Sequence, residues 1–127
     1  MKNLSLLALF FITTNAFAQV GVGTTSPNST LDVRGSLSTN YRAFTANTSA
    51  GTDNNLVFTG TSATTLTLPD ATTMTGRAYW IKNNSSNAST LTIATTSSQT
   101  IDGVTTWALS ERYKALKLVS NGTNWDI

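Results

Sequence analysis

The sequence predicts an all-β protein, in which a small antiparallel β-sandwich, jelly-roll or β-prism-like domain follows an extended N-terminal arm. Short segments alternate apolar and polar residues, which is the pattern of strands that bury one face. Threonine, serine and asparagine are abundant, at 25, 14 and 12 of the 127 residues. Threonine favours strands, whereas serine and asparagine favour turns. No stretch after residue 18 shows a helical period.

Residues 1–18 have the parts of a secretory signal peptide. Lys2 supplies the positive start, Leu4–Ile12 is a short apolar run, and Ala16-Phe17-Ala18 is a small-residue cleavage site. The apolar run is shorter than the roughly 20 residues that a membrane-spanning helix needs. The sequence therefore predicts cleavage after Ala18, a secreted or cell-surface location, and no membrane span in the mature chain.

Residues 19–39 are predicted to be an extended arm that packs poorly against its own domain. The segment is rich in glycine, serine and threonine, and Pro27 enforces a turn. Val20 and Val22 stand at alternating positions, as do Leu31 and Val33. An arm with this pattern can add a strand to the sheet edge of another chain. Val20 and Val22 are therefore candidate interface residues.

Residues 40–127 are predicted to form the β domain. Turn residues separate its apolar segments, among them Pro69, Asn83–Asn87 and Asp102-Gly103. The TLTLP and TLTIA segments look alike, but threonine-rich alternating strands produce such likeness by chance. Strands are expected at 41–46, 56–58, 64–68, 77–82, 90–94, 99–101, 104–109, 112–120 and 123–127.

The last segment of the chain predicts a tight hairpin. Asn121-Gly122 suits a two-residue type I′ turn, in which both central residues have positive φ. That turn would place Leu118 opposite Trp125 on an apolar face and Lys117 opposite Asp126 on the other face. Trp125 is therefore predicted to be a core residue.

Two segments resemble known protein families. GVGTTSPNSTLDVRG, at residues 21–35, is similar to a stretch near the N-termini of secreted proteins of Bacteroidota and of phage tail-fibre-like proteins. From Thr64 to Ile127, the order TLTLPDA, GRAYWIKNNS, QTIDGVT and LKLVSNGTNWDI resembles a β module of the same groups. This resemblance implies a β-sandwich or β-prism unit that is often trimeric in fibres.

Composition excludes several kinds of chemistry. The chain has no histidine and no cysteine, so Ser-His-Asp, Cys-His and zinc arrangements cannot be built. The formal net charge of +2 lacks the clustered basic footprint of a nucleic-acid-binding protein. Most carboxylates stand at turn positions, where their backbone hydrogen bonds explain them. Asp53-Asn54-Asn55 lacks the full ligand ladder of a calcium loop. We therefore expect no enzyme activity, no cofactor and no metal.

The three tryptophans are the strongest ligand candidates. Trp125 and Trp107 are assigned to the core, Trp107 because it shares a face with Leu109. Trp80 is the exception, since Tyr79 and Ile81 take the opposite face and leave Trp80 outside beside Lys82. An exposed tryptophan next to a lysine marks either a subunit interface or a platform for stacking sugar. The interface is favoured, because a small short-stranded domain gains stability from a partner.

These observations lead to one hypothesis with two alternatives. The first is an exported, non-catalytic structural or adhesive module of a cell-surface or tail-fibre-like assembly. It would be a homo-oligomer, a trimer or a filament, and would contact a surface ligand such as a glycan. The alternatives are a monomeric carbohydrate-binding module, or a filament subunit joined through its N-terminal arm.

Overall fold

The computed structural model describes residues 19–127, so the predicted signal peptide lies outside the described residues. The chain divides into a first unit that ends at Leu37 and a second unit from Ser38 to Ile127. The described residues hold strands joined by loops and one 3-10 turn, Ala71–Thr73, so the all-β prediction is confirmed. They contain no helix with the length and apolar character needed to cross a membrane.

The first unit folds back on itself instead of staying extended throughout. Strands β1 (Val20–Val22) and β2 (Leu31–Val33) pair in parallel, with Val20 opposite Leu31. Gly23 permits the turn that follows β1, since its φ is +74° and a side chain there would meet the Arg34 carbonyl oxygen at 2.8 Å. The valines of β1 remain about half exposed, at 53% and 52%. Within residues 19–37, the unit is therefore held by backbone pairing and the turn at Gly23, and no residue of this range is buried.

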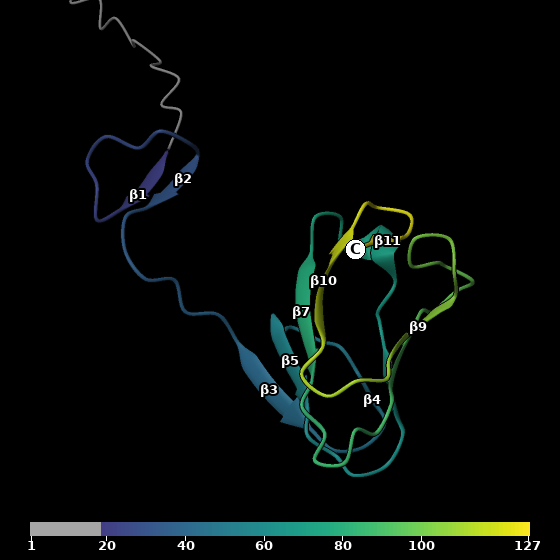
Figure 1. Ribbon diagram of the computed structural model, residues 1–127. Helices are drawn as coiled ribbons and strands as arrows, with labels where there is room; N and C mark the ends of the chain where they lie inside the picture. The colour runs from purple at the N-terminus through teal and green to yellow at the C-terminus, as the bar shows by residue number, and fades with distance from the viewer. Residues whose placement is uncertain (1–18) are drawn as a thin grey trace, which may run out of the picture. The chain divides into compact units, whose positions relative to one another are not determined.

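The second unit consists of two sheets that face each other (Figure 1). The five-stranded sheet has the order β11-β10-β7-β5-β3, and the four-stranded sheet has the order β4-β6-β8-β9. The strands are β3 (Tyr41–Phe44), β4 (Thr48–Ser49), β5 (Asn55–Phe58), β6 (Thr64–Thr67), β7 (Ala78–Asn83), β8 (Leu91–Ala94), β9 (Thr106–Leu109), β10 (Ala115–Ser120) and β11 (Trp125–Asp126).

The chain winds through this sandwich as a short coil. From β3 to β8, each strand lies in the sheet opposite to the strand before it. Within each sheet, every second strand pairs in parallel with the next, as β3 with β5, β4 with β6, β5 with β7 and β6 with β8. Strands β9, β10 and β11 then pair antiparallel and end the winding. The predicted sandwich is therefore confirmed, but its antiparallel pairing is correct only for β9, β10 and β11 and wrong for the pairs among β3 to β8. Because the strand between two neighbours lies in the other sheet, the chain returns to the first sheet in its original direction, and the two neighbours are parallel.

The coils differ in length, which hides the repeat in the sequence. Asn55 pairs with Tyr41 on one side and with Trp80 on the other, so the second coil is much longer than the first. TLTLP and TLTIA lie on neighbouring strands, but Leu66 of β6 lies opposite Ile93 of β8, two residues beyond the Leu91 that their likeness would align with it. The pairing register therefore does not follow the likeness.

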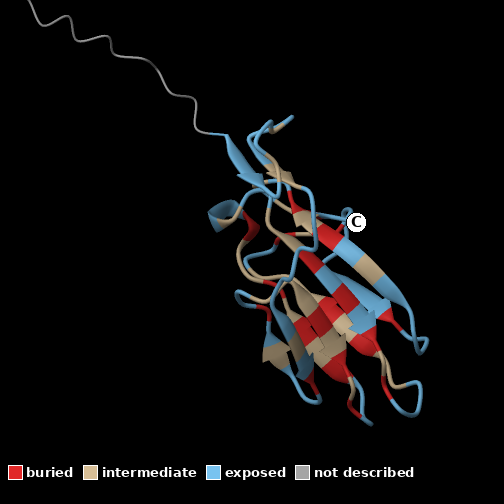
Figure 2. Cartoon of the chain, turned by 90° about the vertical axis from the view of Figure 1, so that its left-hand side faces the viewer, coloured by how far each residue is buried: buried red, intermediate tan, exposed pale blue. Residues whose placement is uncertain are grey.

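The core fills the space between the two sheets, where buried residues alternate with less buried ones along β5, β6, β7 and β8 (Figure 2). Phe44 contacts Phe58, with ring centroids 5.7 Å apart. Tyr79 contacts Trp125, with centroids 5.5 Å apart, and both side chains are fully buried. Aromatic pairs at such distances add stability beyond the area they bury. The prediction that Trp125 belongs to the core is confirmed.

The register of the C-terminal hairpin differs from the prediction. Trp125 lies opposite Ser120, and Asp126 lies opposite Val119, so neither the Leu118–Trp125 pair nor the Lys117–Asp126 pair forms. Only Gly122 of the turn dipeptide has positive φ, at +90°, whereas a type I′ turn needs two such residues. The Asn121 side-chain oxygen instead accepts hydrogen bonds from the N–H groups of Thr123 (2.9 Å) and Asn124 (2.8 Å). This side chain therefore stabilises a longer loop and moves the register by two residues.

Candidate functional site

The five-stranded sheet turns one face away from the core, and we call this its outer face. Two rows of paired residues cross it. The first row is Tyr41, Asn55, Trp80 and Lys117, and the second is Ala43, Val57, Lys82 and Ala115. The outer face therefore combines aromatic, amide and ammonium groups on one regular surface.

Strand β7 shows why the sequence places Trp80 there. Its residues alternate strictly, so that Tyr79, Ile81 and Asn83 are buried while Trp80 and Lys82 point outward. Trp80 is 55% exposed although it sits on a central strand. A large apolar side chain in such a place gains little stability from burial, which makes it a candidate for binding.

A shallow hollow of about 270 Å³ lies on the outer face. Tyr41, Val57 and Trp80 form much of its apolar lining, and Asn55 and Lys82 add polar groups. Tyr41 is 63% exposed. Two strand spacings separate Tyr41 from Trp80, which places their backbones about 10 Å apart. The two rings thus flank an open platform.

Three cations stand beside the aromatic rings of this region. The Lys117 ammonium lies 5.6 Å from the centre of the Trp80 ring, and the Lys82 ammonium lies 5.6 Å from the centre of the Tyr113 ring. The Arg112 guanidinium is 4.5 Å from the same tyrosine ring. Within residues 19–127, three ion pairs form, and none of them includes these cations.

Tyr113 has an unusual backbone conformation. Its φ is +70°, which is rare for a bulky residue and costs on the order of 1–3 kcal/mol. Its N–H donates to the Asn83 carbonyl oxygen at 2.6 Å, which holds this conformation. The ring itself is 60% exposed. The strained turn therefore presents an aromatic ring next to Lys82 instead of burying it.

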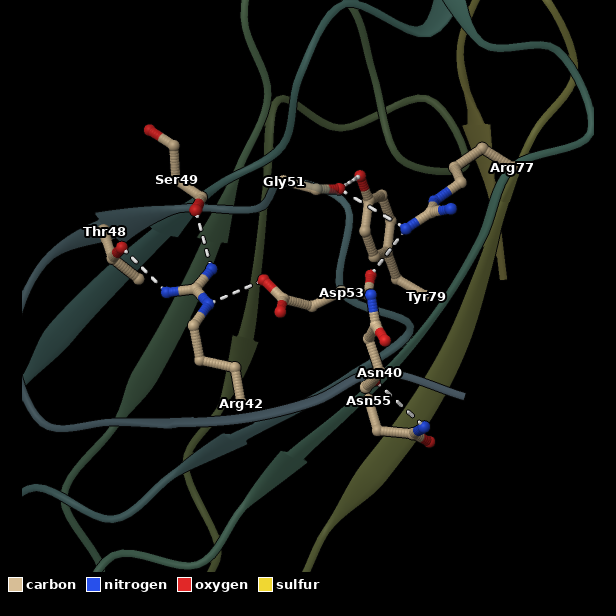
Figure 3. Close-up of polar contacts among 9 residues, drawn as sticks. All are labelled: Asn40, Arg42, Thr48, Ser49, Gly51, Asp53, Asn55, Arg77 and Tyr79. Atoms are coloured by element: carbon tan, nitrogen blue, oxygen red, sulfur yellow. Dashed lines mark hydrogen bonds and ion pairs between the residues drawn. The ribbon is translucent and has the colours of Figure 1, made fainter. Parts of the chain in front are cut away.

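Partly buried polar contacts position the loop that leads into β5 (Figure 3). The Tyr79 hydroxyl donates to the Gly51 carbonyl oxygen at 2.7 Å, and Arg77 donates to the Asp53 carbonyl oxygen at 2.8 Å. The Asp53 carboxylate forms an ion pair with Arg42 at 2.7 Å. These contacts fix the start of β5 and with it Asn55. Arg42 also neutralises the carboxylate of the Asp53-Asn54-Asn55 segment.

A second polar anchor fixes the other end of β7. Asn83 is fully buried, and its side-chain N–H groups donate to the carbonyl oxygens of Ser89 (2.8 Å) and Leu109 (2.7 Å). Its side-chain oxygen accepts from the Ser85 N–H at 3.0 Å. Because Leu109 belongs to the four-stranded sheet, Asn83 ties the two sheets together directly beside Lys82.

Trp107 is not a core residue, contrary to the prediction. It lies opposite Ile93 on the inner side of its sheet, as expected, but β9 is an edge strand and the ring remains 37% exposed. Together with Leu116 and Ile127, it lines a second hollow of about 430 Å³. Pairing position therefore gave the correct side of the sheet but not the degree of burial.

The carboxylates of the second unit do not converge on a site. Within residues 19–127, no group of three or more carboxylate, histidine or cysteine side chains is placed to hold a metal ion. Asp70 caps the 3-10 turn, where it accepts hydrogen bonds from the hydroxyl and N–H of Thr72 and from Gln99. These bonds, those of Thr72 above all, lower the pKa of Asp70 below its usual value. Asp70 therefore has a structural explanation.

The predicted site residues fall in two places. Trp80 and Lys82 lie together on the outer face, whereas Val20 and Val22 lie in the first unit, paired to β2. Sequence reasoning missed five participants. Tyr41, Asn55 and Lys117 join the site only through cross-strand register. Tyr113, with Arg112 beside its ring, joins only through a positive φ that no local motif indicates.

Comparisons with known proteins give no match. No protein-family model matches the chain, and neither a curated protein nor a solved structure matches it significantly. The resemblance to secreted Bacteroidota and tail-fibre-like proteins therefore stays a prediction.

Proposed function

We infer that the chain is an exported, non-catalytic adhesion module that binds a surface glycan on the outer face. The observation that carries this proposal is the row in which Tyr41 and Trp80 flank Asn55, with both rings more than half exposed. Aromatic rings pack against the apolar faces of sugar rings, and an amide between them can hydrogen-bond to hydroxyls. The spacing of about 10 Å between the two strands suits two sugars in sequence.

The openness of the site supports an extended ligand. The hollow is shallow and is lined by residues of four strands, β3, β5, β7 and β10, whereas sites for small molecules are concave and bury most of the ligand. A polysaccharide chain can lie across such a surface and continue beyond it on both sides. Asn55 is held for this role, since its side-chain N–H donates to the Thr39 hydroxyl at 2.8 Å and leaves its oxygen to accept.

Assembly into a homo-oligomer or fibre is the second proposal, and it has its own supporting observation. Among the described residues, β3 and β4 each pair with a strand on one side only. They are the first strands of the two sheets, so both sheets begin with an unpaired edge. Such edges accept further strands. The outer face suits self-association less well, because a two-fold interface there would bring lysines against lysines.

Two measurements test these proposals. A glycan array with residues 19–127 should show binding that is lost in Trp80→Ala and kept in Thr92→Ala, a change on the outer side of the other sheet. An array without any binder would contradict the adhesion proposal. Light scattering at micromolar concentration should show an oligomer if the open edges assemble, and a stable monomer would contradict assembly.

A further inference from the structure

We propose that the glycan bound on the outer face is acidic, and that carboxylate or sulfate groups along its chain pair with Lys117, Lys82 and Arg112. This inference rests on the proposed function and adds the chemical class of the ligand. The aromatic rings explain why a sugar would bind but do not distinguish neutral from charged sugars. The cations provide that distinction.

The three cations form a strip along β7 and β10. Lys117 lies opposite Trp80, and Lys82 lies opposite Ala115, so the two lysines stand diagonally across one strand pair. Diagonal neighbours in a sheet are about 7–8 Å apart. The contact between Lys82 and Tyr113 continues the strip to Arg112. Each of the three cations of the strip therefore lies beside an aromatic ring.

None of these three cations has an anionic partner in the described residues. The ion pairs of this part of the chain join Arg34 to Asp32, Arg42 to Asp53 and Lys114 to Glu111. The outer face does carry Asp126, opposite Val119 on the last strand, but its carboxylate forms no ion pair with the three cations and accepts a hydrogen bond from the Asn121 side chain at 2.9 Å. The strip thus holds three cations without a direct ion pair, next to stacking surfaces.

The arrangement of the rings also matches a chain of anionic sugars. Each ammonium lies 5.6 Å from a ring centre while its lysine stays exposed to water, and the contact with the ring favours this position. An anion that docks there completes a charge-assisted hydrogen bond to a group already in place. The strained conformation of Tyr113 supports the same conclusion, because strain of this kind gathers at ligand-binding sites.

Single-stranded nucleic acid also combines negative charge with stacking groups, but the surface suits it less well. Proteins that bind it follow the backbone with a basic groove, whereas this chain has a formal net charge of only +2 and three cations on the strip. Nucleic acid is therefore the competing ligand that the test has to include.

The test uses immobilised polysaccharides that share a backbone and differ only at C6: β-1,4-glucan, its C6-carboxylated form and its C6-sulfated form, with the corresponding mannan pair. Binding of residues 19–127 is measured by biolayer interferometry at low and high salt. We expect at least one acidic form to bind about tenfold more tightly than its neutral partner, with the preference lost at high salt. Comparing the carboxylated with the sulfated form identifies the anion.

Variants assign the preference to the strip. The double variant Lys82→Gln, Lys117→Gln should lose the preference for acidic forms, about tenfold in affinity. Lys114→Gln is the matched control, because Lys114 pairs with Glu111 and does not line the outer hollow. Circular dichroism checks that each variant is folded.

The two proposals fail in different ways. Equal binding of neutral and acidic forms overturns the acidic-glycan inference and leaves the adhesion proposal standing. An acidic preference that persists in the double variant also overturns the inference. Tighter binding to a thymidine oligonucleotide than to any acidic glycan overturns it in favour of nucleic acid. Failure to bind any polysaccharide here or on the glycan array contradicts both proposals.

Discussion

The two sheets of the second unit share one core but differ in what they present outside. The outer side of the four-stranded sheet carries Thr65, Thr67, Thr92 and Thr106 with two alanines, and no aromatic or charged residue stands among them. The five-stranded sheet has tyrosine, tryptophan and lysine at equivalent positions. Threonine satisfies strand propensity at a solvated position without a further role. The departure from threonine on one sheet is therefore the contrast on which the proposed function rests.

The largest effect tests the shared core on which both faces depend. Trp125→Ala should lower the free energy of unfolding by about 3–5 kcal/mol, because it leaves a large cavity against Tyr79. Chemical denaturation measures this loss. Trp125→Phe is the control and should cost less, since it keeps ring packing and removes an indole N–H that is buried without an acceptor in the described residues. Equal losses in the two variants would contradict a packing role.

The next effect tests whether the two sheets act as one body. Asn83→Ala removes the hydrogen bonds that tie β7 to Leu109 and should cost about 3 kcal/mol of stability. Asn87→Ala removes an exposed hydrogen bond from the Asn87 side-chain amide to the Thr61 carbonyl oxygen and should cost less than about 1 kcal/mol. Thermal unfolding of both variants compares them. Similar melting temperatures for the two variants would mean that the Asn83 hydrogen bonds between the sheets do not stabilise the fold.

A third effect separates the two outer sides directly. Trp80→Ala should weaken glycan binding by about 2 kcal/mol, or roughly thirtyfold, while stability changes little. Thr92→Ala on the opposite sheet should leave affinity unchanged. Titration calorimetry with the tightest ligand from the array gives both values. A loss of affinity in Thr92→Ala as large as that in Trp80→Ala would remove the contrast between the sheets.

The smallest effect concerns acid. The pKa of Asp70 is lowered by its bonds to Thr72 and Gln99, so its charged form is stabilised in the folded state. Its contribution is present above the unfolded pKa of about 3.9 and is lost as the pH falls through the lowered folded value. Asp70→Asn should therefore be less stable than the parent chain at neutral pH, and this difference should shrink below pH 4. Denaturation at pH 7 and pH 3 measures it, and a difference that grows in acid would contradict the assignment.

Local alternation predicted which side each residue takes, but not its neighbours. Tyr79 and Trp80 were separated correctly, because adjacent residues of a strand point to opposite faces. Trp125 was assigned to the core from a wrong register, and the assignment held because a shift of two residues preserves the face. Parallel pairing could not be predicted, since β3 and β5 are joined through Thr48–Ser49, a strand too short to leave a pattern.

The candidate site could likewise be predicted only where its residues share one strand. Trp80 and Lys82 could be named from the sequence because they share one strand, whereas Tyr41 and Lys117 join them only when the strands are set side by side. The predicted register paired Lys117 with Asp126, so the sequence did not indicate that Lys117 is without an ion pair beside Trp80. Tyr113 depends on backbone strain, for which the sequence gives no signal.

The winding of the chain sets the order in which the structure can be completed during synthesis. Each strand from β5 to β8 pairs with one made earlier, so every coil has its template when it leaves the ribosome. The two sheets can therefore gain strands in turn, while β9, β10 and β11 are synthesised last and pair antiparallel with β8, β7 and β10. Lys117 and Tyr113 belong to this closing segment. The strip gains Lys117 and Arg112 only when the fold is finished, so an incomplete chain would carry Trp80 and Lys82 without these two cations.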